Sequence, residues 1–199
     1  MIRGWFTIAY QPDQQPKWDA IREKLMDRSH PSNQADALKQ LVLLSYSETI
    51  PPHLLMPIIQ YTATTNDHRV IKLLLIFLEN CDTRDSTGKM RPEFLLIIDA
   101  IRKLLLHPNE YIRGAALRFL YKVNDIEVLQ QLLTPILNNL THNDEYVRRH
   151  AAILVGRIAR DIPSFIDSVS DSIIEAFSTE ADQRTLTAML YSAYQANPI

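Results

Sequence analysis

Apolar residues recur every three or four positions along most of the chain, which is the spacing of an amphipathic α-helix and not of a strand. Prolines and polar capping residues, more often than the four glycines, separate these stretches. The pattern predicts helices that pair into about five hairpins, at residues 16–46, 51–80, 92–123, 125–160 and 163–196.

The second half of the chain contains an internal repeat. The segment 107–123 returns 35 residues later as 142–158, and both copies carry Glu-Tyr, a β-branched residue, Arg and a nearby pair of alanines. Leu54–Ile59 returns as Leu132–Leu137, about two periods on, and this places Pro57 and Pro135 inside first helices of repeats, where a lost backbone bond bends a helix. Such a period is typical of a helical solenoid.

Each copy of the repeat begins with a capping residue, Asn109 or Asp144, whose side chain can accept hydrogen bonds from the first helical turn. Arg113 and Arg148 follow the β-branched residue. The pattern resembles the second helix of a HEAT repeat, in which the Asp caps and the Arg bonds to the adjacent repeat. We therefore interpret these four residues as structural.

These patterns predict an all-α fold: a right-handed α-solenoid of HEAT-like hairpins over residues 16–199, preceded by a short extended arm over residues 1–15. The arm is expected to pack on the first helices through its apolar residues, Trp5, Phe6, Ile8 and Tyr10. The last hairpin fits the repeat least well and is expected to leave four residues without a neighbour: Leu186, Met189, Leu190 and Tyr194. We therefore expect a longer protein, or another chain that covers this end.

Composition excludes several classes of protein. With 21 Lys and Arg against 23 Asp and Glu, the chain lacks the basic excess of a dedicated nucleic-acid binder. The single Cys81 allows no disulfide framework and fits a reducing cytosol. No apolar run reaches the length of a membrane span.

The chain offers no pattern of catalytic, cofactor-binding or metal-binding residues. Its six histidines are His30, His53, His68, His107, His142 and His150. Four of them lie near predicted helix starts, and none pairs with a second ligand at metal-binding spacing. There is no glycine-rich phosphate loop and no nucleophile elbow. An enzyme is not expected.

The helix expected from Pro92 to Leu106 carries more apolar surface than one packing face needs. One arc collects the core residues Phe94, Ile97, Ile98, Ile101, Leu104 and Leu105. Leu95 and Leu106 fall outside this arc, beside Asp99, Arg102 and Lys103. An apolar patch rimmed by charge indicates a partner site. Alternatively, a solenoid helix that touches two neighbours needs a wide apolar face.

Several segments together resemble one family. They are Trp5–Asp13, Leu54–Tyr61, Lys72–Phe77, His107–Leu120 and Tyr146–Ala151. They resemble, in order and at similar spacing, the amino-terminal part of the beta subunits of coatomer, which are related to the large adaptins of clathrin adaptors. The likeness fades beyond about residue 165.

The resemblance implies a non-enzymatic scaffold of the COPI coat, in Golgi-to-ER and intra-Golgi transport. Such a protein is cytoplasmic, associates peripherally with Golgi and COPI vesicle membranes through the coat, and has no nucleic-acid partner. Its partners are the GTP form of an Arf small GTPase and other coatomer subunits. The matching adaptin contact falls on Leu95, Ile98 and Asp99, and Arg102 and Leu106 complete the candidate set.

Two alternatives remain open from the sequence. One is a large adaptin of a clathrin-type adaptor complex. The other is a generic HEAT scaffold, which would be indifferent to Arf and would bind through its concave second-helix face, with residues such as Arg118, Lys122, Arg157 and Arg160.

Overall fold

The structure, a computed structural model, describes residues 18–46, 50–84, 88 and 91–196, and its regular elements are all helical. In chain order they are α1 (Trp18–Met26), α2 (Pro31–Leu44), η1 (Pro52–Leu54), α3 (Leu55–Thr62), α4 (His68–Asn80), α5 (Pro92–Leu95), α6 (Ile98–Leu105), α7 (Glu110–Leu120), α8 (Ile126–Leu137), η2 (Asn138–Thr141), α9 (Glu145–Asp161), η3 (Pro163–Phe165), α10 (Ile166–Thr179) and α11 (Gln183–Ala196). The predicted extended arm, residues 1–15, lies outside the described residues.

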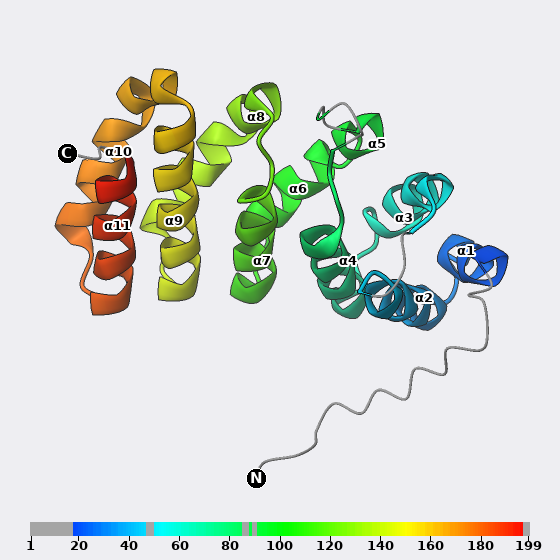
Figure 1. Ribbon diagram of the computed structural model, residues 1–199. Helices are drawn as coiled ribbons and strands as arrows, with labels where there is room; N and C mark the ends of the chain where they lie inside the picture. The colour runs from blue at the N-terminus through cyan, green and yellow to red at the C-terminus, as the bar shows by residue number, and fades with distance from the viewer. Residues whose placement is uncertain (1–17, 47–49, 85–87, 89–90, 197–199) are drawn as a thin grey trace, which may run out of the picture.

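The helices form two rows (Figure 1). The second helices of the hairpins, α2, α4, α7, α9 and α11, stand side by side, and each packs on the next. The first helices form the other row, in which α1 contacts α3, α3 contacts α5, and α6 contacts α8. The predicted all-α solenoid of helical hairpins is confirmed.

One apolar layer runs between the rows for the length of the molecule. Its largest fully buried side chains include Phe77 of α4, Phe94 of α5 and Phe119 of α7. Buried apolar residues continue from Ile21 in α1 to Met189 in α11. Each repeat therefore buries its apolar face against its neighbours and not in a single central core.

Side-chain caps begin the second helices of the middle repeats. Asp67 Oδ1 accepts hydrogen bonds from the backbone N–H groups of Arg69 and Val70 at the start of α4, at 2.8 and 3.2 Å. Asn109 caps α7 through Ile112, and Asp144 caps α9 through Tyr146 and Val147. These bonds satisfy N–H groups that have no partner within the helix.

The first helices differ from the prediction. The single helix expected from Pro92 to Leu106 is two segments, α5 and α6, separated by a turn at Leu96 and Ile97. The repeat that begins at Pro52 also opens with a short turn, η1, before α3. Pro57 therefore lies in the first turn of α3, where no intrahelical bond is lost, and its expected place in a helix interior was wrong. Pro135 does lie inside its helix, α8.

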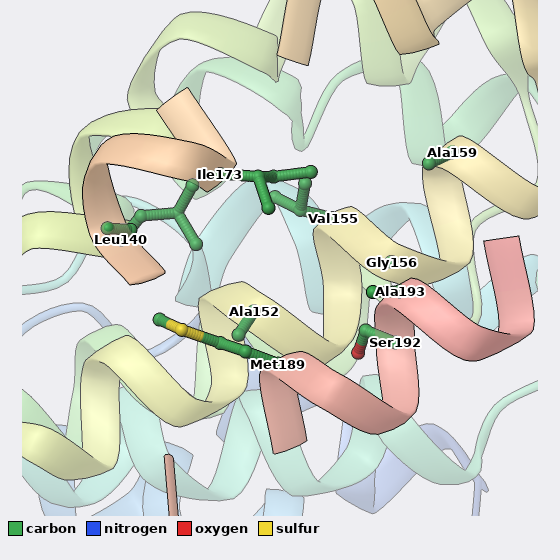
Figure 2. Close-up of a pocket in the computed structure, with 10 residues that line it drawn as sticks. Leu140, Ala152, Val155, Gly156, Ala159, Ile173, Met189, Ser192 and Ala193 are labelled. Carbon is green, nitrogen blue, oxygen red and sulfur yellow. The ribbon is translucent and has the colours of Figure 1, made fainter. Parts of the chain in front are cut away.

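The last repeat encloses a small apolar cavity. Figure 2 shows an apolar cavity of about 50 Å³ between α9, α10 and α11, lined by residues such as Ala152, Ile173 and Met189. The prediction that Met189 has no neighbour was wrong, because Met189 is buried against α9, and Leu186 is half-buried. Leu190 and Tyr194 are exposed as expected.

Candidate docking site on the α5–α6 segment

The arginines of the internal repeat point into the joints between repeats. Arg113 Nε donates to the carbonyl of His107 at 3.0 Å, and its Nη1 donates to Asn139 Oδ1 at 3.2 Å. Arg148 binds Glu180 of the next hairpin with two hydrogen bonds, at 2.6 and 2.8 Å. Both guanidinium groups therefore have hydrogen-bond partners within the chain.

His107 and His142 take equivalent places ahead of these two helices. The Nδ1 atom of His107 accepts from the backbone N–H of Asn109 at 2.9 Å, and that of His142 accepts from Asp144 at 3.0 Å. Burial lowers the pKa of both imidazoles, and this favours the neutral ring that can accept such a bond. The repeat spacing of these histidines has a structural cause.

The basic residues of the generic-scaffold alternative are mostly engaged within the chain. Arg157 is buried, donates to the carbonyl of Val123 at 2.6 Å and also bonds to Asn124. Arg118 binds Glu79 at 3.0 Å, and Arg160 binds its neighbour Asp161. Arg157 therefore cannot meet a partner on the concave face without losing these bonds.

The structure separates the five residues of the sequence-predicted docking site. Leu95, the last residue of α5, is 49% exposed, and Leu106, just after α6, is 56% exposed. Ile98 is 9% exposed and belongs to the core, so its expected contact with a partner is not available on this surface. Asp99 is exposed, Arg102 is partly exposed, and the two form an ion pair across one turn of α6.

Two grooves flank the turn between α5 and α6. Each groove is lined by a different leucine.

 Leu95 lines a groove of about 370 Å³ that reaches Asp125 and Glu127 at the start of α8. Leu96, 60% exposed, lines a groove of about 710 Å³ between α6 and α3, together with Asp99. The break in the helix thus turns two consecutive leucines toward different neighbours.

Comparison with known proteins identifies the family. A sequence model described as the adaptin N terminal region matches residues 14–197 of the chain. The chain belongs to the adaptin N-terminal region family.

Relatives within this family are coat subunits. Coatomer subunit beta of Trypanosoma brucei brucei is 38% identical over 148 residues, which cover 74% of this chain and 15% of that protein. Coatomer subunit beta-1 of Oryza sativa subsp. japonica is 40% identical over 136 residues, 68% of this chain and 14% of that protein. Coatomer subunit beta of Rattus norvegicus is 33% identical over 194 residues, 96% of this chain and 20% of that protein. The chain therefore spans a fifth or less of the length of these relatives.

Solved structures support the fold of this adaptin region. Computationally designed armadillo repeat proteins for modular peptide recognition superpose with a TM-score of 0.66, over 94% of this chain and 95% of theirs, at 15% identity. An engineered protein superposes with a TM-score of 0.65, over 92% of this chain and 80% of its own, at 18% identity. Likeness at these identities shows the solenoid fold alone.

The sequence pattern missed part of the surface that this adaptin region exposes around α6. Leu96 is exposed, and Met56 of α3 lies across the groove from it. A helical wheel drawn through residues 92–106 assumes one continuous helix. It cannot place Leu96, because the turn at Leu96 and Ile97 changes the angle between the residues of α5 and those of α6. The run of five apolar residues at 94–98 was the available signal, since it is longer than one helix face can bury.

Three properties of the described residues bear on the chemistry of this adaptin region. Among the described residues, no group of three or more His, Cys, Asp or Glu side chains lies together in a way that could hold a metal ion. Burial raises the pKa of Cys81 to about 11, so its thiol stays protonated and unreactive at neutral pH. A search of the described helices finds none that is long and apolar enough to cross a membrane.

Proposed function

We propose that this chain is an amino-terminal scaffold segment of a COPI coat subunit. On this proposal it works in Golgi-to-ER and intra-Golgi transport by docking to the GTP-bound form of an Arf small GTPase and to other coat subunits. It would lie on the cytoplasmic side of Golgi and COPI vesicle membranes and be held there through the coat. The relatives reported above are all coatomer beta subunits, and this favours COPI over a clathrin-type adaptor.

The observation that carries the docking proposal is the exposed apolar surface of the α5–α6 segment. Leu95, Leu96 and Leu106 are each about half exposed, although the rest of this segment supplies core residues. The pair Asp99–Arg102 lies among them. Folding gains nothing from leaving such side chains in water, so an apolar cluster with a charged rim is the usual form of a protein-docking surface.

A docking surface of this kind suits recognition of a nucleotide state. The switch loops of a small GTPase are ordered only when the γ-phosphate is present. An apolar surface that fits the ordered loops therefore binds one nucleotide state. A modest affinity suffices when several contacts of one coat act together on one membrane, because linked sites raise the effective concentration of each other.

The test is titration calorimetry of this chain with Arf loaded with a GTP analogue and, separately, with GDP. We expect binding to the GTP form alone. Leu95→Asp is expected to abolish that binding while the helical circular dichroism signal stays unchanged. Ile174→Asp is the matched control, because Ile174 is 66% exposed on α10, far along the chain from this segment.

The variant Leu96→Asp distinguishes docking in one groove from docking in the other. If Leu96→Asp abolishes binding and Leu95→Asp does not, the GTPase docks in the α3–α6 groove, and Leu95 leaves the candidate set. If the folded chain binds neither form of Arf, or if Ile174→Asp weakens binding as much as the leucine variants, the docking proposal fails.

A further inference from the structure

Charge is nearly balanced over the whole chain, with a net charge of −2, but it is unevenly distributed between the two rows of helices. On the second helices α2, α4, α7, α9 and α11, Lys and Arg outnumber Asp and Glu. On the first helices α5, α8 and α10, every charged residue is acidic. The row of second helices therefore presents a positive surface that the overall composition conceals.

The exposed side of α4 and α7 concentrates this charge. We define the inner surface by six residues: Arg69, Lys72 and Ile76 of α4, Tyr111 and Arg118 of α7, and Lys122 just after α7. Within each helix they fall at spacings of three, four or seven, so they lie on one face. Arg118 bonds to the carboxylate of Glu79 of α4 and Lys122 donates to the backbone carbonyl of Glu79, which holds the two faces side by side (Figure 1).

Aromatic side chains extend the inner surface toward α9. The ring of Tyr111, a residue that is 59% exposed, lies 5.7 Å from that of Tyr146, and the ring of Tyr146 lies 4.5 Å from that of His150. Arg118 Nη1 donates to the hydroxyl of Tyr146 at 3.0 Å. The surface thus runs across three repeats, along the length of the solenoid and not along one helix.

The cations of the inner surface are only partly neutralised. The Glu79 carboxylate pairs with Arg118, and the Asp67 carboxylate lies 3.6 Å from the Arg69 guanidinium. Lys122 donates to the backbone carbonyl of Glu79, and Lys72 has no hydrogen-bond or ion-pair partner among the described residues. Two of the four cations thus pair with a carboxylate, which leaves this surface positive and ready to take further carboxylates from outside.

The spacing of the helices selects the shape of an acidic partner. Packed helices stand about 8–10 Å apart, and an extended chain advances about 3.3 Å per residue. An extended segment that crosses α4, α7 and α9 therefore meets a new helix about every third residue. A carboxylate can reach Lys72 on α4, and others can reach Arg118 and Lys122 toward the end of α7, while an apolar side chain can lie on Ile76 or Tyr111.

We propose that the inner surface binds an extended acidic segment of a partner protein, one that carries carboxylates at about every third residue. This site lies on the second helices, whereas the proposed Arf site lies on the first helices, so the two can be occupied together. It does not depend on the proposed coat function.

The probe is a fluorescein-labelled twelve-residue peptide with Glu at every third position, one central Phe and Ser elsewhere. A second peptide has Gln in place of each Glu. Binding to the whole chain is followed by fluorescence anisotropy at low salt and at high salt. Vesicles of phosphatidylcholine with phosphatidylserine are tested by co-sedimentation, since an anionic membrane is the competing occupant.

The expected result is that the Glu peptide binds and the Gln peptide does not, and that high salt weakens binding. The double variant Lys72→Glu with Lys122→Glu is expected to weaken binding by about tenfold or more. The matched control, Lys24→Glu with Lys103→Glu, makes the same change in net charge on the first helices and is expected to leave affinity within about twofold.

The single variant Lys72→Glu tests whether a loss of binding could come from misfolding. Lys72 has no partner to lose among the described residues. The variant is therefore expected to weaken binding while the melting temperature stays unchanged. The proposal is overturned if the Gln peptide binds equally, if the first-helix pair weakens binding as much as the inner pair, or if the chain binds the vesicles and not the peptide.

Discussion

Arg113 of α7 donates a hydrogen bond to the side-chain oxygen of Asn139, a fully buried residue in the turn that follows α8. The amide nitrogen of Asn139 in turn donates to the carbonyls of Leu105 at 3.1 Å and Pro135 at 2.7 Å. One asparagine therefore joins the end of α6, the start of α7 and the end of α8. This bond network fixes the joint between the third and fourth hairpins.

Replacing Asn139 should loosen that joint. Asn139→Leu has a similar volume but leaves Arg113 and two carbonyls without their partner, and we expect the free energy of unfolding to fall by about 2–4 kcal/mol. Urea denaturation followed by circular dichroism measures this loss. Asn138→Leu is the control, because the neighbouring Asn138 is exposed, and an equal loss in the control would show that Asn139 has no special role.

The two helical glycines of the internal repeat should not tolerate alanine. A Cβ atom on Gly114 would lie 2.2 Å from Cε1 of Tyr146, and one on Gly156 would lie 2.1 Å from Cβ of Ser192 and 2.8 Å from its Cα. We expect Gly114→Ala to destabilise by about 1–3 kcal/mol. Gly156→Ala should destabilise the protein more than Gly114→Ala. Its new Cβ atom would meet the backbone of Ser192, which cannot move aside as the Tyr146 ring can.

A double-mutant cycle tests the cause at Gly114. Once Tyr146→Ala has removed the ring, Gly114→Ala should instead stabilise α7 by about 1 kcal/mol, since alanine is the better helix former. Thermal unfolding of the four proteins gives the cycle. If Gly114→Ala remains destabilising without the ring, contact with Tyr146 is not the reason for glycine at this position.

The ion pair between Arg148 and Glu180 should contribute more to the free energy of unfolding than the ion pairs on the surface. The side chain of Glu180 is almost fully buried, so Arg148→Met would leave a buried carboxylate unpaired, and we expect a loss of about 3 kcal/mol. Arg102→Met is the control, because its pair with Asp99 is exposed and should contribute less than about 1 kcal/mol. Chemical denaturation at pH 7 compares the two, and similar losses would contradict this ranking.

Folding stability should fall as the pH is lowered from about 6.5 toward 4. Burial, then the nearby Arg118 and Arg149, lowers the pKa of His150 to about 4 in the folded state, against about 6.5 when unfolded. The unfolded chain therefore binds the proton first, and stability present above pH 6.5 is lost as the pH falls toward 4. The loss from this residue is up to about 3 kcal/mol.

Urea denaturation at pH 7.0 and 5.0 measures this dependence. The lowered pKa of His107 and His142 acts in the same direction, so His150→Gln should reduce the difference between the two pH values without removing it. His53→Gln, at an exposed position, is the control. A pH dependence that His150→Gln leaves unchanged would contradict the assignment.

Local sequence determined most of the fold. The period of apolar residues, the capping residues Asn109 and Asp144, and the recurrence of residues 107–123 at 142–158 predicted the helices, their starts and their pairing. These features could be predicted because a helix, its cap and the turn to its partner involve residues close together in the chain. Solenoid contacts lie between adjacent repeats, so a correct hairpin order already implies which helices pack together.

The candidate docking site could be predicted only in part. Periodicity pointed to Leu95 and Leu106 as surplus apolar surface, and both are exposed. It also assumed one continuous helix, and this hid Leu96. Periodicity assigned Ile98 to the core, where it lies, and only the family resemblance brought it into the candidate set. Whether this surface binds Arf remains a prediction from the family resemblance.

The sequence by itself determined the helices and their order, because these follow from spacing along the chain. Tertiary structure decided the joints between repeats: the buried Asn139, the Tyr146 ring on Gly114 and the turn at Leu96. It also gathered Lys72 and Lys122 on one face, although they are distant in sequence. Apart from the turn at Leu96, these relationships join residues of different hairpins, and their geometry depends on how closely two packed helices approach, which no local pattern encodes.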